Sequence, residues 1–183
     1  MSAHLRFEQV SLRRGGRLLF EGLDLSLGPG EALRVSGPNG SGKSSLIRLA
    51  AGLLQPEQGN VERTRLALAD DQLALDREVT LARALGFWVS SAMHAIEDFG
   101  LTELIQVPVR LLSSGQQKRA TLARVVASGA PLWLLDEPLN ALDSDSMARL
   151  AGVIQKHLAH GGAVLAASHQ SLPGTWGTLE LRP

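Results

Sequence analysis

The residues from Gly37 to Ser44 have the types and the spacing of a loop that binds a polyphosphate. They read Gly-Pro-Asn-Gly-Ser-Gly-Lys-Ser, which fits the pattern G-x-x-x-x-G-K-[ST]. Glycine lets backbone N–H groups turn toward phosphate oxygens, Lys43 supplies a compact positive charge, and the Ser44 hydroxyl can ligate Mg²⁺. The residues expected to hold the phosphates are Gly37, Pro38, Asn39, Gly40, Ser41, Gly42, Lys43, Ser44 and Ser45.

The flanks of this loop predict a strand that leads into it and a helix that leaves it. Residues 32–36 form a short apolar run with a β-branched Val35, and residues 44–51 carry apolar positions at helical spacing. The positive N-terminal end of such a helix adds to the attraction for phosphate. A glycine-rich turn that binds nothing is the alternative, and the flanks disfavour it.

A second chemical feature is the acidic pair Asp136 and Glu137, which follows the apolar run 132–135. At the carboxyl end of a buried strand, Asp136 can hold Mg²⁺ directly or through water. Glu137 points elsewhere and can polarise the water that attacks a γ-phosphate. Acidic pairs at strand ends are also common surface features, so the upstream phosphate loop is what favours catalysis here. We therefore expect a site that hydrolyses ATP with Mg²⁺.

Composition excludes several other classes of function. The 183-residue chain has a formal net charge of zero and scattered arginines, so no basic surface for nucleic acid is predicted. It contains no cysteine, which excludes disulfides and thiolate metal sites. No apolar run reaches the length of a membrane span, and residues 1–6 lack the apolar core of a signal sequence. We expect a single domain over residues 1–183.

The rest of the sequence predicts the elements that must position these groups. Segments 5–11 and 23–27 alternate apolar and polar residues, like strands of an antiparallel sheet. The other expected elements are one or two short strands within 61–70, a helical insert at about 80–112, a helix over 114–127, a strand at 132–135, a helix capped by Asp143, and a buried strand at 163–167. This order predicts an α/β fold with a parallel, helix-covered core sheet, a small antiparallel β lobe and a short helical subdomain.

The segment 112–116, Leu-Ser-Ser-Gly-Gln, resembles the signature motif of ABC-type ATPases, with Ser114 where glycine is more usual. Other motifs of that family follow in its order: the P-loop at 37–44, the signature, the Walker B strand with Glu137, and His169 after the last buried strand. The resemblance covers nearly the whole chain. The ordered set of motifs is far more specific than any one of them.

This resemblance implies the P-loop NTPase fold of ABC-type ATPases, with a RecA-like core sheet, and it assigns further roles. A lone His169 would more often be a satisfied histidine at a strand end, but in this order it resembles the switch histidine that contacts the γ-phosphate. Gln72 matches the Q-loop glutamine of the family, which serves in catalysis and as a ligand of Mg²⁺. The expected metal ligands are thus Ser44, Gln72 and Asp136. Residues 140–143 resemble the D-loop.

The resemblance also implies that two copies of the chain act together. In the family, the signature helix faces the P-loop of the other subunit, so two Mg-ATP molecules lie between two head-to-tail copies. Ser113, Gly115 and Gln116 are the residues expected to contact ATP in this way. The arrangement suits a helix N-terminus, since Ser113 offers a hydroxyl and Gly115 lets the backbone approach phosphate closely. A monomer should then be nearly inactive.

The sequence departs from the family at the place where adenine should be held. ABC cassettes usually carry an aromatic residue near the end of the first strand, and here Arg13 and Arg14 stand there. An arginine plane can stack on a base, so we expect Arg14 to bind the nucleotide, with base selectivity left open. Two solvated arginines before a Gly-Gly turn are an equal alternative. The stretch from Lys43 to Ser113 is shorter than is typical, which indicates a trimmed cassette.

Several details resemble one subgroup, the haem-exporter ATP-binding subunit of cytochrome c biogenesis. They are Val107-Pro108-Val109, the run Gly115 to Arg119, Leu132-Trp133, and Gly161-Gly162 before Ser168-His169-Gln170. Core packing is the alternative explanation of Trp133. The alternative functions are the ATP-binding subunit of another ABC exporter with different cargo, and a soluble ABC-type ATPase acting on nucleic acid or ribosomes. The latter would carry tandem cassettes or basic arms, which this chain lacks.

On this resemblance the cassette serves a separate integral membrane permease at the cytoplasmic face of a bacterial inner membrane. It would associate with the membrane through that partner only, and no nucleic-acid partner is expected. As a hypothesis, Gln72 and the insert from Thr80 to Phe99, including Trp88, receive the permease. The alternative is that Trp88, Met93 and Phe99 form the insert's own small core.

Overall fold

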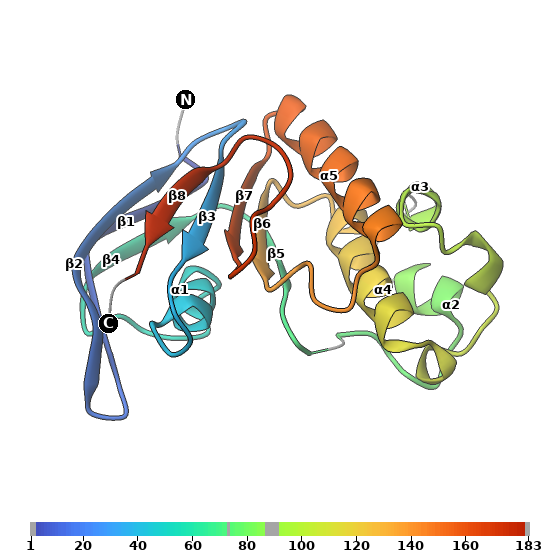
Figure 1. Cartoon of the computed structure of the whole chain (residues 1–183), viewed down its shortest axis with the longest axis horizontal. Helices are drawn as coiled ribbons and strands as arrows, with labels where there is room; N and C mark the ends of the chain where they lie inside the picture. Colours follow the sequence, from blue (N-terminus) through green and yellow to red (C-terminus); the bar gives the residue numbers. More distant parts are fainter. Residues whose placement is uncertain (1–2, 73, 87–91, 182–183) are drawn as a thin grey trace.

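A computed structural model describes residues 3–72, 74–86 and 92–181, and the strands within this part of the chain form two sheets (Figure 1). The antiparallel sheet has the order β2-β1-β4, with β1 at Leu5–Arg14, β2 at Arg17–Leu27 and β4 at Gln58–Arg63. The parallel sheet has the order β5-β6-β7-β3-β8, with β5 at Leu66–Ala69, β6 at Leu132–Asp136, β7 at Ala163–Ala167, β3 at Ala32–Ser36 and β8 at Gly177–Glu180. The predicted fold class is confirmed.

Strands β6 and β7 lie inside the parallel sheet, and every residue of both is buried. Their continuous apolar sequences are typical of strands that are covered on both faces. Leu135 of β6 pairs with Ala69 of β5, and Asp136 pairs with Ala167 of β7. Because these strands are parallel, the residues that follow all three emerge at one edge of the sheet.

Helices cover both faces of this sheet. They are α1 (Lys43–Ala50), α4 (Ser114–Ala127) and α5 (Ser144–Ala159). Leu132 and Leu134 of β6 belong to the apolar cluster that contains α1, whereas Trp133 and Leu135 belong to the cluster that contains α4 and α5. This division follows from the two-residue period of a strand, which sends successive side chains to opposite faces.

Local capping signals set where these helices begin. The Asp143 carboxylate accepts a hydrogen bond of 2.8 Å from the Ser146 N–H, so the predicted N-cap of α5 is confirmed. Ser113 caps α4 in the same way and forms a capping box with Gln116. Gly161, with φ of 80°, follows the last turn of α5.

The segment predicted as a helical insert contains only short helical pieces in its described part. They are α2 (Leu81–Gly86), α3 (Ala92–Asp98) and the 3₁₀ turns η1 (Thr102–Leu104) and η2 (Val109–Leu111). These pieces lie at the opposite end of the molecule from the antiparallel sheet (Figure 1). Phe99 is buried in the main core, whereas Met93 is 48% exposed, so the two do not share a small core of their own. Trp88 lies outside the described residues.

The segment 61–70, predicted to supply one or two short strands, contains β5 and the end of β4, which begins earlier at Gln58; the two strands join different sheets. Strand β8 was not predicted from the sequence, because its mostly exposed residues show no apolar alternation and it pairs with β3 at the edge of the sheet. Within the described residues, no helix is long and apolar enough to cross a membrane.

Candidate nucleotide-binding site

The loop between β3 and α1 has the backbone shape that its glycines allow. Gly37 has φ of 145°, and a Cβ added there would lie 2.4 Å from the Leu181 carbonyl oxygen and 2.7 Å from the Ser41 Oγ. Gly42 has φ of 102° and is the residue before α1. Larger residues at these two positions would be strained, so the glycines of the predicted P-loop are required by the chain itself.

Lys43 and Ser44 occupy the first turn of α1. The Lys43 ammonium is buried and donates to the carbonyl oxygens of Gly37 and Pro38, at 2.8 and 3.0 Å. It therefore lies within the curve of the loop, where the P-loop motif requires a point charge. Ser44 is exposed, and its hydroxyl lies close enough to the Asp136 carboxylate to lower the pKa of that group. The two predicted metal ligands are thus neighbours.

Asp136 ends β6 beneath the loop and is 4% exposed. Burial raises its pKa, and the nearby Ser44 hydroxyl partly opposes this. Its Oδ1 is buried and has no hydrogen-bond partner among the described residues. A buried carboxylate oxygen without a partner fits a cation, and Mg²⁺ commonly takes one or two protein ligands together with phosphate oxygens and water. The described residues include no group of three or more acidic or histidine side chains that would form a complete cage.

Glu137 and His169 meet at the edge of the sheet. Glu137 has φ of 45°, a rare value for a residue with a side chain, and its N–H donates to Ala167 at 2.9 Å. Its carboxylate accepts a hydrogen bond of 2.9 Å from Nδ1 of His169, which follows β7. The pairing comes from the adjacency of β6 and β7. It fixes the Glu137 carboxylate at the mouth of the loop.

A pocket of about 710 Å³ lies against the P-loop, a size suited to a nucleotide. Its lining comes from the P-loop, the start of α1, the β1–β2 hairpin and the end of β6. The lining residues are Arg14, Gly15, Leu19, Asn39, Gly40, Gly42, Lys43, Ser44, Ser45 and Glu137. Most residues predicted to bind phosphate are therefore gathered around one space. Gly37, Pro38 and Ser41 lie in the loop but not in this lining.

The structure distinguishes the two arginines at the hairpin tip. Arg14 lines the pocket, and its Nη1 donates to Ser45 Oγ at 3.3 Å. Arg13 instead lies 3.5 Å from a carboxylate oxygen of Glu57 and bonds to the Gly16 carbonyl. Sequence reasoning missed Leu19, which lines the same wall. Its contact with the loop depends on the fold of the hairpin, which no local pattern encodes.

The signature residues lie at the N-terminus of α4. Ser113 Oγ accepts from the Gln116 N–H at 3.3 Å, and the Ser113 N–H donates to the Gln116 side chain at 2.8 Å. A Cβ added to Gly115 would lie 2.9 Å from the Ala141 carbonyl oxygen, so the signature and the segment 140–143 pack closely. None of these residues is in the described lining of the chain's own P-loop pocket.

Gln72 follows β5, the strand next to β6, and is exposed. Its N–H donates to the Asp70 carboxylate at 3.1 Å. The structure places it near the carboxyl edge of the sheet but not in the pocket lining, so its predicted roles in catalysis and metal binding stay predictions.

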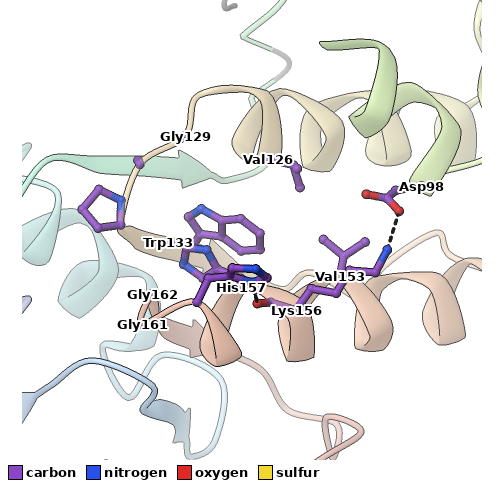
Figure 2. Close-up of a pocket in the computed structure, with 12 residues that line it drawn as sticks. Asp98, Val126, Gly129, Trp133, Val153, Lys156, His157, Gly161 and Gly162 are labelled. Atoms are coloured by element: carbon purple, nitrogen blue, oxygen red, sulfur yellow. Dashed lines mark hydrogen bonds and ion pairs between the residues drawn. The ribbon is translucent and has the colours of Figure 1, made fainter. Parts of the chain in front are cut away.

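Trp133 lies on the other side of the core, away from the P-loop. Its ring stacks on His157 with centroids 3.6 Å apart, beside a small pocket of about 440 Å³ between α4 and α5 (Figure 2). A Cβ added to Gly162 would lie 2.2 Å from the His157 ring, so that glycine leaves room for the stack. Burial lowers the pKa of His157. Core packing therefore accounts for Trp133 and for Gly162.

The fold and this site together define a P-loop nucleotide-binding protein of the ATP-binding cassette class. Residues 20–140 match the family model described as ABC transporter. A solved structure from Pyrococcus furiosus, a putative ABC transporter ATP-binding protein, superposes with a TM-score of 0.85 at 22% identity, covering 97% of this chain and 96% of that one. A dimeric ATP-binding cassette bound to ADP and Pi gives a TM-score of 0.79 at 21% identity, covering 91% and 88%.

Relatives of higher sequence identity place the chain in one subgroup of this class. The chain is 52% identical over 180 residues to the cytochrome c biogenesis ATP-binding export protein CcmA of Sphingopyxis alaskensis, covering 94% of this chain and 93% of the relative. It is 54% identical over 166 residues to the CcmA protein of Novosphingobium aromaticivorans, covering 89% and 87%. The chain belongs to the ABC transporter family of ATP-binding proteins and, within it, to the cytochrome c biogenesis ATP-binding export proteins CcmA.

Proposed function

We propose that the chain is the ATP-hydrolysing subunit of a bacterial transporter that exports haem for cytochrome c biogenesis. The names of its relatives support the export role in cytochrome c biogenesis, and the subgroup resemblance of the sequence supplies haem as the cargo. The observation that supports hydrolysis is the position of Glu137, which lines the P-loop pocket at the end of the Walker B strand and hydrogen-bonds to His169.

The chemistry follows from where these side chains lie. In this proposal the P-loop and Lys43 hold the phosphates of ATP, and Ser44 and Asp136 would bind Mg²⁺; the buried position of the Lys43 ammonium within the loop supports this. Mg²⁺, when bound, neutralises charge on the phosphate oxygens. Glu137 polarises the attacking water and takes up its proton, while His169 holds the Glu137 carboxylate and reaches toward the γ-phosphate. Because water is a poor nucleophile, orienting the attacking water is the main contribution of these side chains to catalysis.

A second copy of the chain completes the site in this proposal. The signature residues Ser113 and Gly115 sit at a helix N-terminus, which attracts phosphate, yet they do not line the chain's own pocket. A head-to-tail dimer brings the signature of one copy to the P-loop of the other. Two Mg-ATP molecules are then enclosed between the copies.

Substitution of Glu137 by glutamine tests this mechanism. The neutral amide cannot take up a proton, so the rate of ATP hydrolysis should fall by about 100-fold or more, with ATP binding preserved. The variant should also accumulate an ATP-bound dimer in solution scattering. Lys43→Ala is the control for binding and should stay monomeric because it does not retain ATP. Parental turnover in Glu137→Gln would refute the assignment of the base.

The partner in this proposal is an integral membrane permease, which holds the chain at the cytoplasmic face of the inner membrane. The docking surface in this proposal consists of Gln72 and the insert from Thr80 to Phe99. In its described part this surface presents Met93, which is 48% exposed. Identifying the membrane protein and the ligand that co-purify with the chain tests the partner and the cargo together. A complex without haem would favour an exporter of different cargo.

A further inference from the structure

The turn that carries His169 is exposed, although the residues on either side of it are buried. Ser168 directly follows β7 and is fully buried, and Leu172 is buried as well, whereas His169, Gln170 and Ser171 are exposed. The His169 side chain is 51% exposed, so packing alone does not fix the rotamer of its ring. Its hydrogen bond to the carboxylate at the end of β6 therefore depends on how the main chain of this turn is held.

Hydrogen bonds within the turn join Gln170 to the two residues before it. The Gln170 N–H donates to Ser168 Oγ at 3.1 Å, and the Gln170 side-chain nitrogen lies 3.3 Å from Nε2 of His169. Nδ1 of the same ring lies 2.9 Å from the Glu137 carboxylate, so both ring nitrogens have a partner. The orientation of the His169 ring is thus coupled to the position of Gln170.

Arg34 holds the main chain of Gln170 from the neighbouring strand β3. Its Nη1 donates to the Gln170 carbonyl oxygen at 3.2 Å and to Ser171 Oγ at 3.5 Å. Strand β3 runs parallel to β7, and the Ser168 N–H donates to the Val35 carbonyl oxygen at 3.1 Å. The sheet thus fixes the start of the turn, and a charged donor, which makes a stronger hydrogen bond than a neutral one, fixes its far side.

We propose that Arg34 is a positioning residue for ATP hydrolysis: it holds the main chain of Gln170 so that the His169 ring keeps its contact with Glu137 at the P-loop pocket. The inference rests on the proposed function, in which Glu137 polarises the attacking water. Arg34 is not in the described lining of that pocket, so its effect on the reaction is indirect. Because β3 leads into the P-loop, one strand supports both the phosphate loop and the turn with His169.

Substitutions of Arg34 test the proposal. Arg34→Met should lower kcat by about tenfold while the KM for ATP changes less than about threefold, because no residue that lines the P-loop pocket is altered. Arg34→Lys should retain kcat within about threefold, since both contacts come from a single nitrogen that an ammonium can replace. The control is Arg6→Met, which removes an exposed arginine that pairs with Glu8 on the antiparallel sheet. That control should keep parental kcat and KM.

A double variant separates positioning of His169 from a general structural loss. If Arg34 acts through His169, Arg34→Met should lower the remaining rate of a His169→Ala protein by less than about twofold. A structural defect would instead reduce that rate by the same factor as in the parent. Single-turnover assays with protein in excess of ATP measure these slow rates. Thermal unfolding of each variant checks that the chain is folded, and Arg34→Gln replaces Arg34→Met in the cycle if the methionine variant does not fold.

The outcomes are distinct. Parental kcat in Arg34→Met, an equal loss in Arg34→Lys, or a full tenfold further loss in the His169→Ala background would overturn the role of Arg34 while leaving the proposed function intact. Parental turnover in His169→Ala itself would instead overturn the part of His169 in the proposed function and this inference with it.

Discussion

In the proposed site, residues at the tip of the β1–β2 hairpin lie where the nucleotide base would be bound. Arg14 and Leu19 line the pocket, and the chain has no tyrosine to stack on a base at this position. A guanidinium plane stacked on the base and an aliphatic side chain beside it give flat or apolar contact, and such contact does not by itself distinguish one purine from another. Affinity for the base and selectivity for the base are therefore separate properties at this site.

Arg14→Ala should weaken binding of ATP and GTP to a similar degree, by about fivefold, because base stacking tolerates any base. Calorimetry measures the affinity for each nucleotide. Both the parent and the Arg14→Ala protein should carry Glu137→Gln, so that ATP is not hydrolysed during the titration. Arg13→Ala is the matched control and should bind as the parent does, since Arg13 faces Glu57. A loss confined to ATP would contradict the interpretation.

His157 predicts a dependence of stability on pH. Burial lowers its pKa below the ordinary value of 6.5 in the folded chain, so the unfolded chain takes up a proton first as the pH falls. The free energy of unfolding should therefore decrease below about pH 6.5, a direction set by greater proton binding in the unfolded state. Urea unfolding of His157→Gln at pH 7.5 and 5.5 should show a smaller difference than the parent. His94→Gln, at an exposed position of α3, should retain the parental difference.

At the scale of elements, tight packing between the signature helix and the D-loop segment joins two motifs that are distant in the sequence. Gly115 allows α4 to approach the Ala141 carbonyl oxygen, and Ala141 itself has φ of 63°. A shift of either segment must therefore move the other. The helix N-terminus that serves phosphate in the proposed dimer is held by contacts within one chain.

Gly115→Ala tests this contact. The added Cβ would lie 2.9 Å from backbone, which cannot yield without moving the segment, so ATPase activity should fall by about tenfold. Gly152→Ala is the matched control within α5, because a Cβ there meets no described atom within 4 Å. That substitution should raise the free energy of unfolding by about 0.5 to 1 kcal/mol and leave activity unchanged. Equal activity in the two variants would mean that the close approach has no functional consequence.

The elements differ in how far the sequence predicts them. Helix α4 and the Asp143 cap of α5 were predicted because their signals are local: a polar cap, helical spacing and flanking glycines. Strand β8 and the contact of Leu19 with the pocket were not, since both depend on pairing between distant segments. The same reason explains why sequence alone could not choose between Arg13 and Arg14.

At the scale of the molecule, the insert between β5 and α4 lies far from the antiparallel sheet (Figure 1). The proposed permease surface and the base-binding wall are therefore at opposite ends, with the parallel sheet between them. A structural change on nucleotide binding can be transmitted to the proposed permease surface through the loop after β5, which carries Gln72. This loop starts beside Asp136, because Ala69 pairs with Leu135.

Met93→Glu should release the chain from membranes that contain the permease without changing its affinity for ATP, because a charge on an apolar docking surface is costly to bury. Membrane flotation of the variant and the parent measures the release. Gln155→Glu, at an exposed position of α5, adds the same charge elsewhere and should remain bound. Continued flotation of Met93→Glu would exclude this part of the insert from the interface.

The hairpin tip has one further consequence. In the proposed site, the loop for the phosphates follows a strand of the parallel sheet, whereas the pocket wall proposed for the base belongs to the antiparallel sheet. Nucleobase preference can therefore drift, or be engineered, by exchanging a few residues around the Gly15-Gly16 turn while the machinery of hydrolysis keeps its form. The cassette is in this sense modular, because nucleotide selectivity and nucleotide hydrolysis depend on separate segments of the chain.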